Sequence, residues 1–95
     1  MKEEMKTMKN LKTLIKSYKN EAKSDWAIKE DMADMYLEDA NDAENALNFI
    51  SDNNIETAAR YISSRDTIVR EAIVVAVAAD KGADWVADNL GWNVN

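Results

Sequence analysis

Carboxylates are the side chains through which this 95-residue chain could do chemistry, because it contains neither cysteine nor histidine. Disulfides, thiolate metal sites and histidine general bases are therefore excluded. Acids gather between residues 30 and 42 at steps of mostly three and four, a spacing that brings side chains onto one face of a continuous helix. The set is Glu30, Asp31, Asp34, Glu38, Asp39 and Asp42. This acidic ridge is predicted to form a strongly negative surface for a protein partner.

Two other interpretations of the acidic ridge stay open. It could be an ordinary solvated face that lysines elsewhere offset, or it could hold a divalent cation. A carboxylate enzyme needs pairs that converge from two helices, whereas the nearest matches, two Asp-x-x-Asp pairs within residues 31–42, lie in adjacent stretches. No glycine-rich phosphate loop or nucleophile–base pair accompanies them. The sequence therefore predicts no enzyme, no metal and no cofactor.

The segment before the ridge carries the opposite charge. Residues 1–24 have a net charge of +4, whereas residues 25–58 hold ten acids against Lys29 alone, a net charge of −9. From Met1 to Ala22, apolar residues recur at helical spacing and lysines follow one position later, which predicts a basic amphipathic helix over residues 1–23. Its lysines are Lys2, Lys6, Lys9, Lys12, Lys16, Lys19 and Lys23. The Met/Leu face of this helix could pair with a second copy of the chain.

Helix breakers are almost absent, since the chain has no proline and only two glycines. We therefore expect one all-α domain over residues 1–95, a compact bundle of five to six helices. Residues 25–58 are the acidic helical segment, with a start at Ser24 and capping boxes at Asn41–Glu44 and Asn53–Glu56.

The apolar part of the bundle comes last in the chain. Residues 66–90 provide an apolar core helix to about Lys81, which is expected in the middle of the bundle because it is apolar nearly all round, and a short C-terminal helix. Gly82 and Gly91 are placed to end these two helices. Of the tryptophans, Trp92 is predicted to be the exposed contact. The acidic edge of Asp80, Asp84 and Asp88 is predicted to face solvent.

The leading hypothesis is a non-catalytic acidic protein that binds a larger partner stoichiometrically and modulates it. In size and charge only, the chain is similar in character to small phage or mobile-element proteins that inhibit host defence or nucleic-acid enzymes. That resemblance implies a partner that is a basic nucleic-acid-binding protein, with the acidic ridge imitating a phosphate backbone. The alternative is a nucleic-acid-associated or structural protein that uses the basic helix.

Location follows from what the sequence lacks. No apolar run approaches the roughly 18–20 residues that a membrane-spanning helix needs, and the lysine-rich start has no apolar signal-peptide region. We expect a cytoplasmic protein with no membrane partner.

Overall fold

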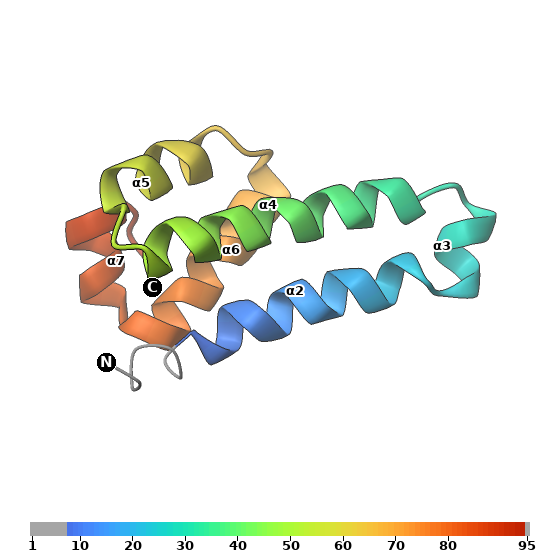
Figure 1. Cartoon of the computed structure of the whole chain (residues 1–95), viewed down its shortest axis with the longest axis horizontal. Coiled ribbons are helices and arrows are strands. Elements are labelled where there is room, and N and C mark those ends of the chain that lie inside the picture. Colours follow the sequence, from blue (N-terminus) through green and yellow to red (C-terminus); the bar gives the residue numbers. More distant parts are fainter. Residues whose placement is uncertain (1–7, 95) are drawn as a thin grey trace.

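Two long antiparallel helices run side by side along the protein and are joined by a short helix at one end (Figure 1). The computed structural model describes residues 8–94, and there it has six helices and no strand, which confirms the all-α prediction. The helices are α2 (Lys9–Ala22), α3 (Asp25–Lys29), α4 (Ala33–Ser51), α5 (Ile55–Ser63), α6 (Thr67–Lys81) and α7 (Ala83–Leu90). α5, α6 and α7 gather at the end opposite α3 and form the body of the bundle with α2 and α4 (Figure 1).

The core lies where α2, α4 and α6 meet. α4 contributes the small side chains of Ala43 and Ala46, whereas α6 contributes the fully buried Ile73. Met8 and Leu11, from the Met/Leu face that was expected to pair two copies of the chain, are buried in this same core. That prediction is wrong for the described part of the face, because the chain covers it with its own helices. Met1 and Met5 lie outside the described residues.

Two helices end without glycine, which changes the predicted layout of the acidic segment. Asp31 and Asn53 both have φ of 62°, the left-handed conformation that usually selects glycine. After Asp31, the amide of Met32 donates to the carbonyl of Ala27 at 2.7 Å, and the amide of Asn54 makes the equivalent bond to Phe49 at 2.8 Å. These are Schellman motifs, and they end α3 and α4.

The helix starts are partly as predicted. Ser24 does cap α3, since its hydroxyl accepts a hydrogen bond from the amide of Ala27 at 3.4 Å. The capping box at Asn41–Glu44 is wrong, because α4 runs unbroken through Asn41 and the chain turns at residues 30–32 instead. No side chain caps the start of α5 at Asn54, so the second capping box is also not formed.

The last two helices have the predicted bounds, and Gly91 ends α7 in the left-handed conformation, with φ of 76°. The predicted central place of α6 is only half right. Ile73 and Val77 are fully buried, yet Ile68 is 82% exposed and Val75 58% exposed on the opposite side of the helix. Trp92 is not the exposed contact that was predicted, because the tail folds back and the Arg70 guanidinium lies 5.0 Å from its ring centroid.

Candidate functional site

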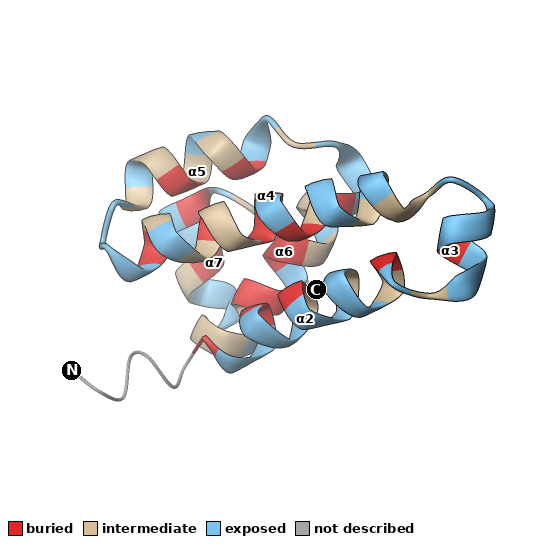
Figure 2. Ribbon diagram, turned by 45° about the vertical axis from the view of Figure 1, so that its right-hand side comes forward, coloured by how far each residue is buried: buried red, intermediate tan, exposed pale blue. Residues whose placement is uncertain are grey.

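The end of the molecule at α3 stands away from the body and carries a distinct surface. We call residues 24–38 the tip: α3, the turn after it and the first part of α4. It lies at one extreme of a molecule 41 Å long, and α3 packs chiefly on α2 (Figure 1). Only Ala27 of α3 is buried, so nearly the whole short helix faces solvent (Figure 2).

Four members of the predicted acidic ridge lie exposed on the tip. Glu30 and Asp31 are in the turn between α3 and α4, and Asp34 and Glu38 follow one helical turn apart on α4. With Asp25, they give the tip five acids against Lys29, a net charge of −4. Because the chain turns at Asp31, the six predicted residues do not lie on a single helix face.

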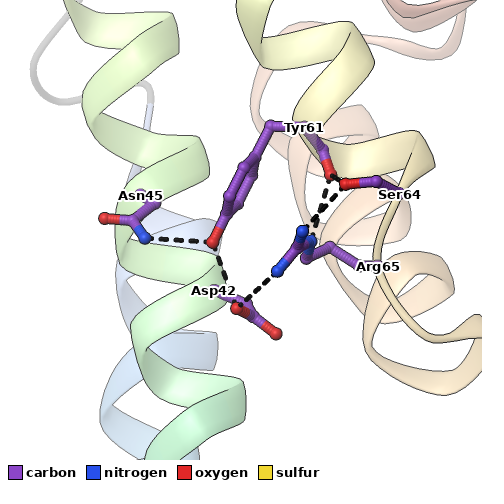
Figure 3. A network of polar contacts seen from close by, with 5 residues as sticks. All are labelled: Asp42, Asn45, Tyr61, Ser64 and Arg65. Carbon is purple, nitrogen blue, oxygen red and sulfur yellow. Dashed lines mark hydrogen bonds and ion pairs between the residues drawn. The ribbon is translucent and has the colours of Figure 1, made fainter.

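Asp42 leaves the ridge altogether, because its carboxylate is buried by the body. Its Oδ1 accepts hydrogen bonds from the Tyr61 hydroxyl at 3.1 Å and from the Arg65 guanidinium at 3.2 Å (Figure 3). Asn45 donates to the same tyrosine oxygen at 3.0 Å, and the Arg65 guanidinium carbon lies 4.2 Å from the Tyr61 ring centroid. The carboxylate therefore ties α4 to α5 and the turn that follows it.

Asp39 stands at the border between the tip and the body. Burial raises the pKa of its carboxyl group, and the neighbouring carboxylates of Asp42, Glu38 and Asp66 raise it further. Burial also raises the pKa of the Tyr18 hydroxyl on α2, and the charges of Asp39 and Asp42 raise it further. Of the predicted ridge, Asp42 is thus buried and Asp39 is partly buried.

Large apolar side chains lie among the exposed acids of the tip. Trp26 is 46% exposed, Ile28 60% and Leu37 50%, and Met35 is 42% exposed. The indole nitrogen of Trp26 donates to a carboxylate oxygen of Glu21, and its ring meets that of Tyr36 edge-on at 5.9 Å between centroids. Trp26 is therefore held in place while half of it remains in contact with water.

Trp26 is the exposed tryptophan of the described residues, whereas the sequence predicted Trp92. Trp26 is the second residue of a five-residue helix, which begins directly after the capping residue Ser24. A helix this short can bury little more than one side chain, and here that residue is Ala27. The exposure of Trp26 could therefore be predicted only if the end of α3 at Lys29 were known.

The structure describes only part of the predicted basic helix, as α2 and the residue that follows it. Lys9, Lys12, Lys16, Lys19 and Lys23 are all exposed, whereas Lys2 and Lys6 lie outside the described residues. Lys19 forms an ion pair with Glu44 of α4 at 3.4 Å. Glu44 does not belong to the acidic ridge, so this ion pair does not involve the exposed acids of the tip.

Asp80 also differs from its prediction, because it is not a solvent-facing acid. Its two carboxylate oxygens accept hydrogen bonds from the backbone amides of Asn10 at 2.7 Å and Leu11 at 2.9 Å. These amides belong to the first turn of α2, where Met8 offers no capping side chain. Asp80 of α6 therefore caps α2 from a distance, which is a structural role.

Other kinds of site find little support in residues 8–94. They contain no group of three or more acidic side chains placed to hold a metal ion. None of their helices combines the length and apolar character needed to cross a bilayer. No family model, curated protein or solved structure matches this chain.

Proposed function

We propose that the protein acts by stoichiometric binding, without catalysis, and that the tip docks onto a larger protein. The docking surface expected on that partner is an apolar recess with a basic rim. The observation that carries the proposal is Trp26, which is fixed by Glu21 and Tyr36 yet 46% exposed on a tip whose net charge is −4.

The apolar side chains supply the affinity in this proposal. Tryptophan is among the residues most enriched in the energetic centres of protein interfaces. Because contacts within the chain already hold Trp26, little side-chain entropy remains to be lost when a partner covers it. Ile28, two residues further along α3 and on another side of this short helix, is also an apolar side chain exposed to water.

The exposed carboxylates supply the choice of partner. Charges around an interface steer encounter and suppress like-charged partners more than they add affinity. The tip has a net charge of −4, so it favours a basic surface. A basic nucleic-acid-binding protein, as expected from the sequence, belongs to this class of partner.

Imitation of a phosphate backbone is the narrower form of the proposal and stays a prediction. It relied on six carboxylates in one row, whereas Asp42 is buried and Asp39 is partly buried. The four that remain, Glu30, Asp31, Asp34 and Glu38, alternate with apolar side chains. A mixed apolar and acidic surface suits a protein pocket better than a channel that accepts only phosphate. Inhibition of a host defence complex by a phage protein likewise stays a prediction.

The test is capture of partners from nuclease-treated lysate by four immobilised forms of the protein. Compared with the wild type, Trp26→Ala should lose about 30-fold in affinity for the captured protein, the effect of about 2 kcal/mol at an interface centre. The triple reversal Asp31→Lys, Asp34→Lys and Glu38→Lys makes the tip positive, so it should slow association and reverse its dependence on salt. The matched control, Asp84→Lys with Asp88→Lys on α7, reverses exposed acids outside the tip and should bind as the wild type does.

The proposal is wrong if the protein captured by the wild type is retained equally by the Trp26 variant and by the triple reversal. Equal losses in the α7 control would also contradict it, since they would indicate a response to net charge alone.

The basic face of α2 supports a second candidate, binding to nucleic-acid phosphates, because all five of its described lysines are exposed. Deletion of residues 1–23 cannot test it, since Leu11 and Ile15 belong to the core. The suitable variant is Lys9→Glu, Lys16→Glu and Lys23→Glu, assayed with duplex DNA at several salt concentrations. Loss of salt-dependent DNA binding in this variant, with no loss in the Trp26 variant, would favour the second candidate over the tip.

A further inference from the structure

The outer side of α6 carries an apolar stripe that the bundle leaves uncovered. It consists of Ile68, Ala72, Val75 and Ala79, spaced by four, three and four residues along one helix face. Ile68 is 82% exposed and Val75 is 58% exposed, whereas Ile73 and Val77 on the other side of the helix are fully buried. Beside the stripe, an open groove of about 610 Å³ lies along the surface between α6 and α2.

The stripe and the groove are nearly free of charge. On the α2 side, the groove is lined by Asn10, Thr13, Leu14 and Ser17, and among all its lining residues only Glu71 is charged. The protein as a whole carries a net charge of −6, so two copies repel each other over most approaches. A neutral face is where like-charged copies can meet at small electrostatic cost, and it offers nothing to a charged partner such as nucleic acid.

The order of large and small residues makes the stripe complementary to itself. When two such helices pack antiparallel about the midpoint between Ile73 and Val74, Ile68 lies opposite Ala79 of the other copy. In the same register, Val75 lies opposite Ala72, because both pairs are symmetric about that midpoint. Each large side chain then meets a small one, as close packing requires. Parallel pairing would set Ile68 against itself and alanine against alanine, which leaves voids.

We propose that the α6 stripe is the interface of a homodimer in which the two α6 helices pack antiparallel. The stripe shares no residue with the tip, so this inference does not depend on the proposed function. It also moves self-association from the Met/Leu face of α2, which the chain buries, to α6.

The size of the face sets the expected strength. Ten residues line the groove, whereas a stable interface of standard size takes about 20–30 residues from each partner. The dimer should therefore be weak and reversible, with dissociation in the micromolar range or above. Because the contact is apolar and neutral, added salt should not weaken it.

The first experiment measures mass by sedimentation equilibrium from about 1 μM to about 1 mM protein. The wild type should pass from monomer to dimer over this range. Ile68→Lys with Val75→Lys should stay monomeric at every concentration, and both positions are exposed enough for the helix to fold. Glu71→Gln should tighten the dimer by about twofold, because it removes a pair of like charges beside the contact. The control Leu37→Lys changes an exposed apolar residue of the tip and should dimerise as the wild type does.

The second experiment tests the direction of packing, and the absence of native cysteine makes it free of background. Copies carrying Ile68→Cys, mixed with copies carrying Ala79→Cys, should form a disulfide-linked heterodimer on mild oxidation. Ile68→Cys alone should not link to itself, because antiparallel packing sets the two positions 11 residues apart along the helix, about 16 Å. Linkage of Ile68→Cys to itself in preference to Ala79→Cys would overturn the antiparallel arrangement.

The dimer itself is refuted by a wild type that remains monomeric at the highest concentration. It is also refuted if the Ile68 and Val75 variant dimerises as the wild type does, since the interface would then lie elsewhere. Circular dichroism of each variant separates loss of the contact from loss of the fold.

Discussion

The two halves of α4 contain acids of the same kind, but the acids of one half are exposed, whereas the other half buries Asp42. In the half that belongs to the tip, Asp34 and Glu38 are exposed, although α2 packs along α4 (Figure 1). In the half that belongs to the body, Asp42 is buried and bonded to Tyr61 and Arg65. The difference does not come from the residue type but from what packs beside the helix: α5 covers the second half of α4 and does not reach the first half (Figure 1).

This contrast separates residues that stabilise the fold from residues that we propose bind a partner, along a single helix. A buried charge with its partners in place becomes costly as soon as one partner is removed. An exposed charge contributes little to the fold and is free to act on another molecule. Substitutions in the body half should therefore change the free energy of unfolding, and substitutions in the tip half should change binding.

The largest effect is expected at Asp42. Asp42→Ala leaves the Arg65 guanidinium and the Tyr61 hydroxyl without their shared acceptor, so the free energy of unfolding should fall by about 2–3 kcal/mol. Urea denaturation followed by circular dichroism measures this, with Asp34→Ala as the matched control on the tip half. The control should change stability by less than about 0.5 kcal/mol. Equal losses in the two variants would contradict the division of α4.

A smaller loss is expected when the remote cap of α2 is removed. Asp80→Ala takes away the acceptor for the amides of Asn10 and Leu11, and loss of a helix cap costs about 1–2 kcal/mol. Asp88→Ala, an exposed acid of α7, is the control and should be nearly neutral. Hydrogen exchange gives a sharper measurement, because the first turn of α2 should lose protection in the Asp80 variant while α7 keeps it. Unchanged protection of these two amides would show that the cap contributes nothing.

The fold could be predicted from the sequence where composition and period carry the information. The absence of proline and the scarcity of glycine indicated helices, and the bounds of α6 and α7 followed from apolar period and from Gly82 and Gly91. The turn at residues 30–32 was missed because Asp31 takes the place of the glycine that usually marks such a turn. Asp and Asn tolerate the left-handed conformation at a modest cost, so these turns carry no distinct signal in one sequence.

The candidate site could be predicted only in part, because burial depends on contacts distant in the chain. The exposed acids were found from charge alone. Asp42 accepts a hydrogen bond from Arg65, and Asp80 accepts one from the amide of Asn10. Both donors are many residues away in the sequence, so helical spacing gives no sign of these contacts. The exposed stripe on α6 was hidden for the same reason, since a helix that is apolar nearly all round gives no sign of which side stays uncovered.

On the tip half, Trp26→Ala should cost the fold about 1 kcal/mol, the contribution of its edge-on contact with Tyr36. The same change should weaken binding of the partner by about 30-fold. Trp26→Ala should therefore affect binding more than stability, whereas Asp42→Ala should affect stability more than binding. Thermal unfolding and partner capture, measured on the same two variants, test this crossed pattern. A Trp26 variant that unfolds as readily as the Asp42 variant would place Trp26 in the core of the protein and remove the basis for a separate tip.

The smallest effect, and the one of opposite sign, is expected at Asp39, on the border of the two halves. Burial and the neighbouring carboxylates raise the pKa of its carboxyl group in the folded state. Between the ordinary pKa and this raised pKa, the folded protein binds more protons than the unfolded chain, so stability falls as the pH rises through that window. At neutral pH the ionised carboxylate therefore weakens the fold, and Asp39→Asn should raise the melting temperature. The gain should shrink as the pH is lowered toward about 3, where the wild-type carboxyl is protonated as well.

Melting curves of the two proteins across this range provide the measurement, with Asp34→Asn as a control for the loss of one charge on the exposed side of α4. If Asp39→Asn lowers the melting temperature at neutral pH, the carboxylate has a stabilising partner, and Asp39 belongs with Asp42 in the body half.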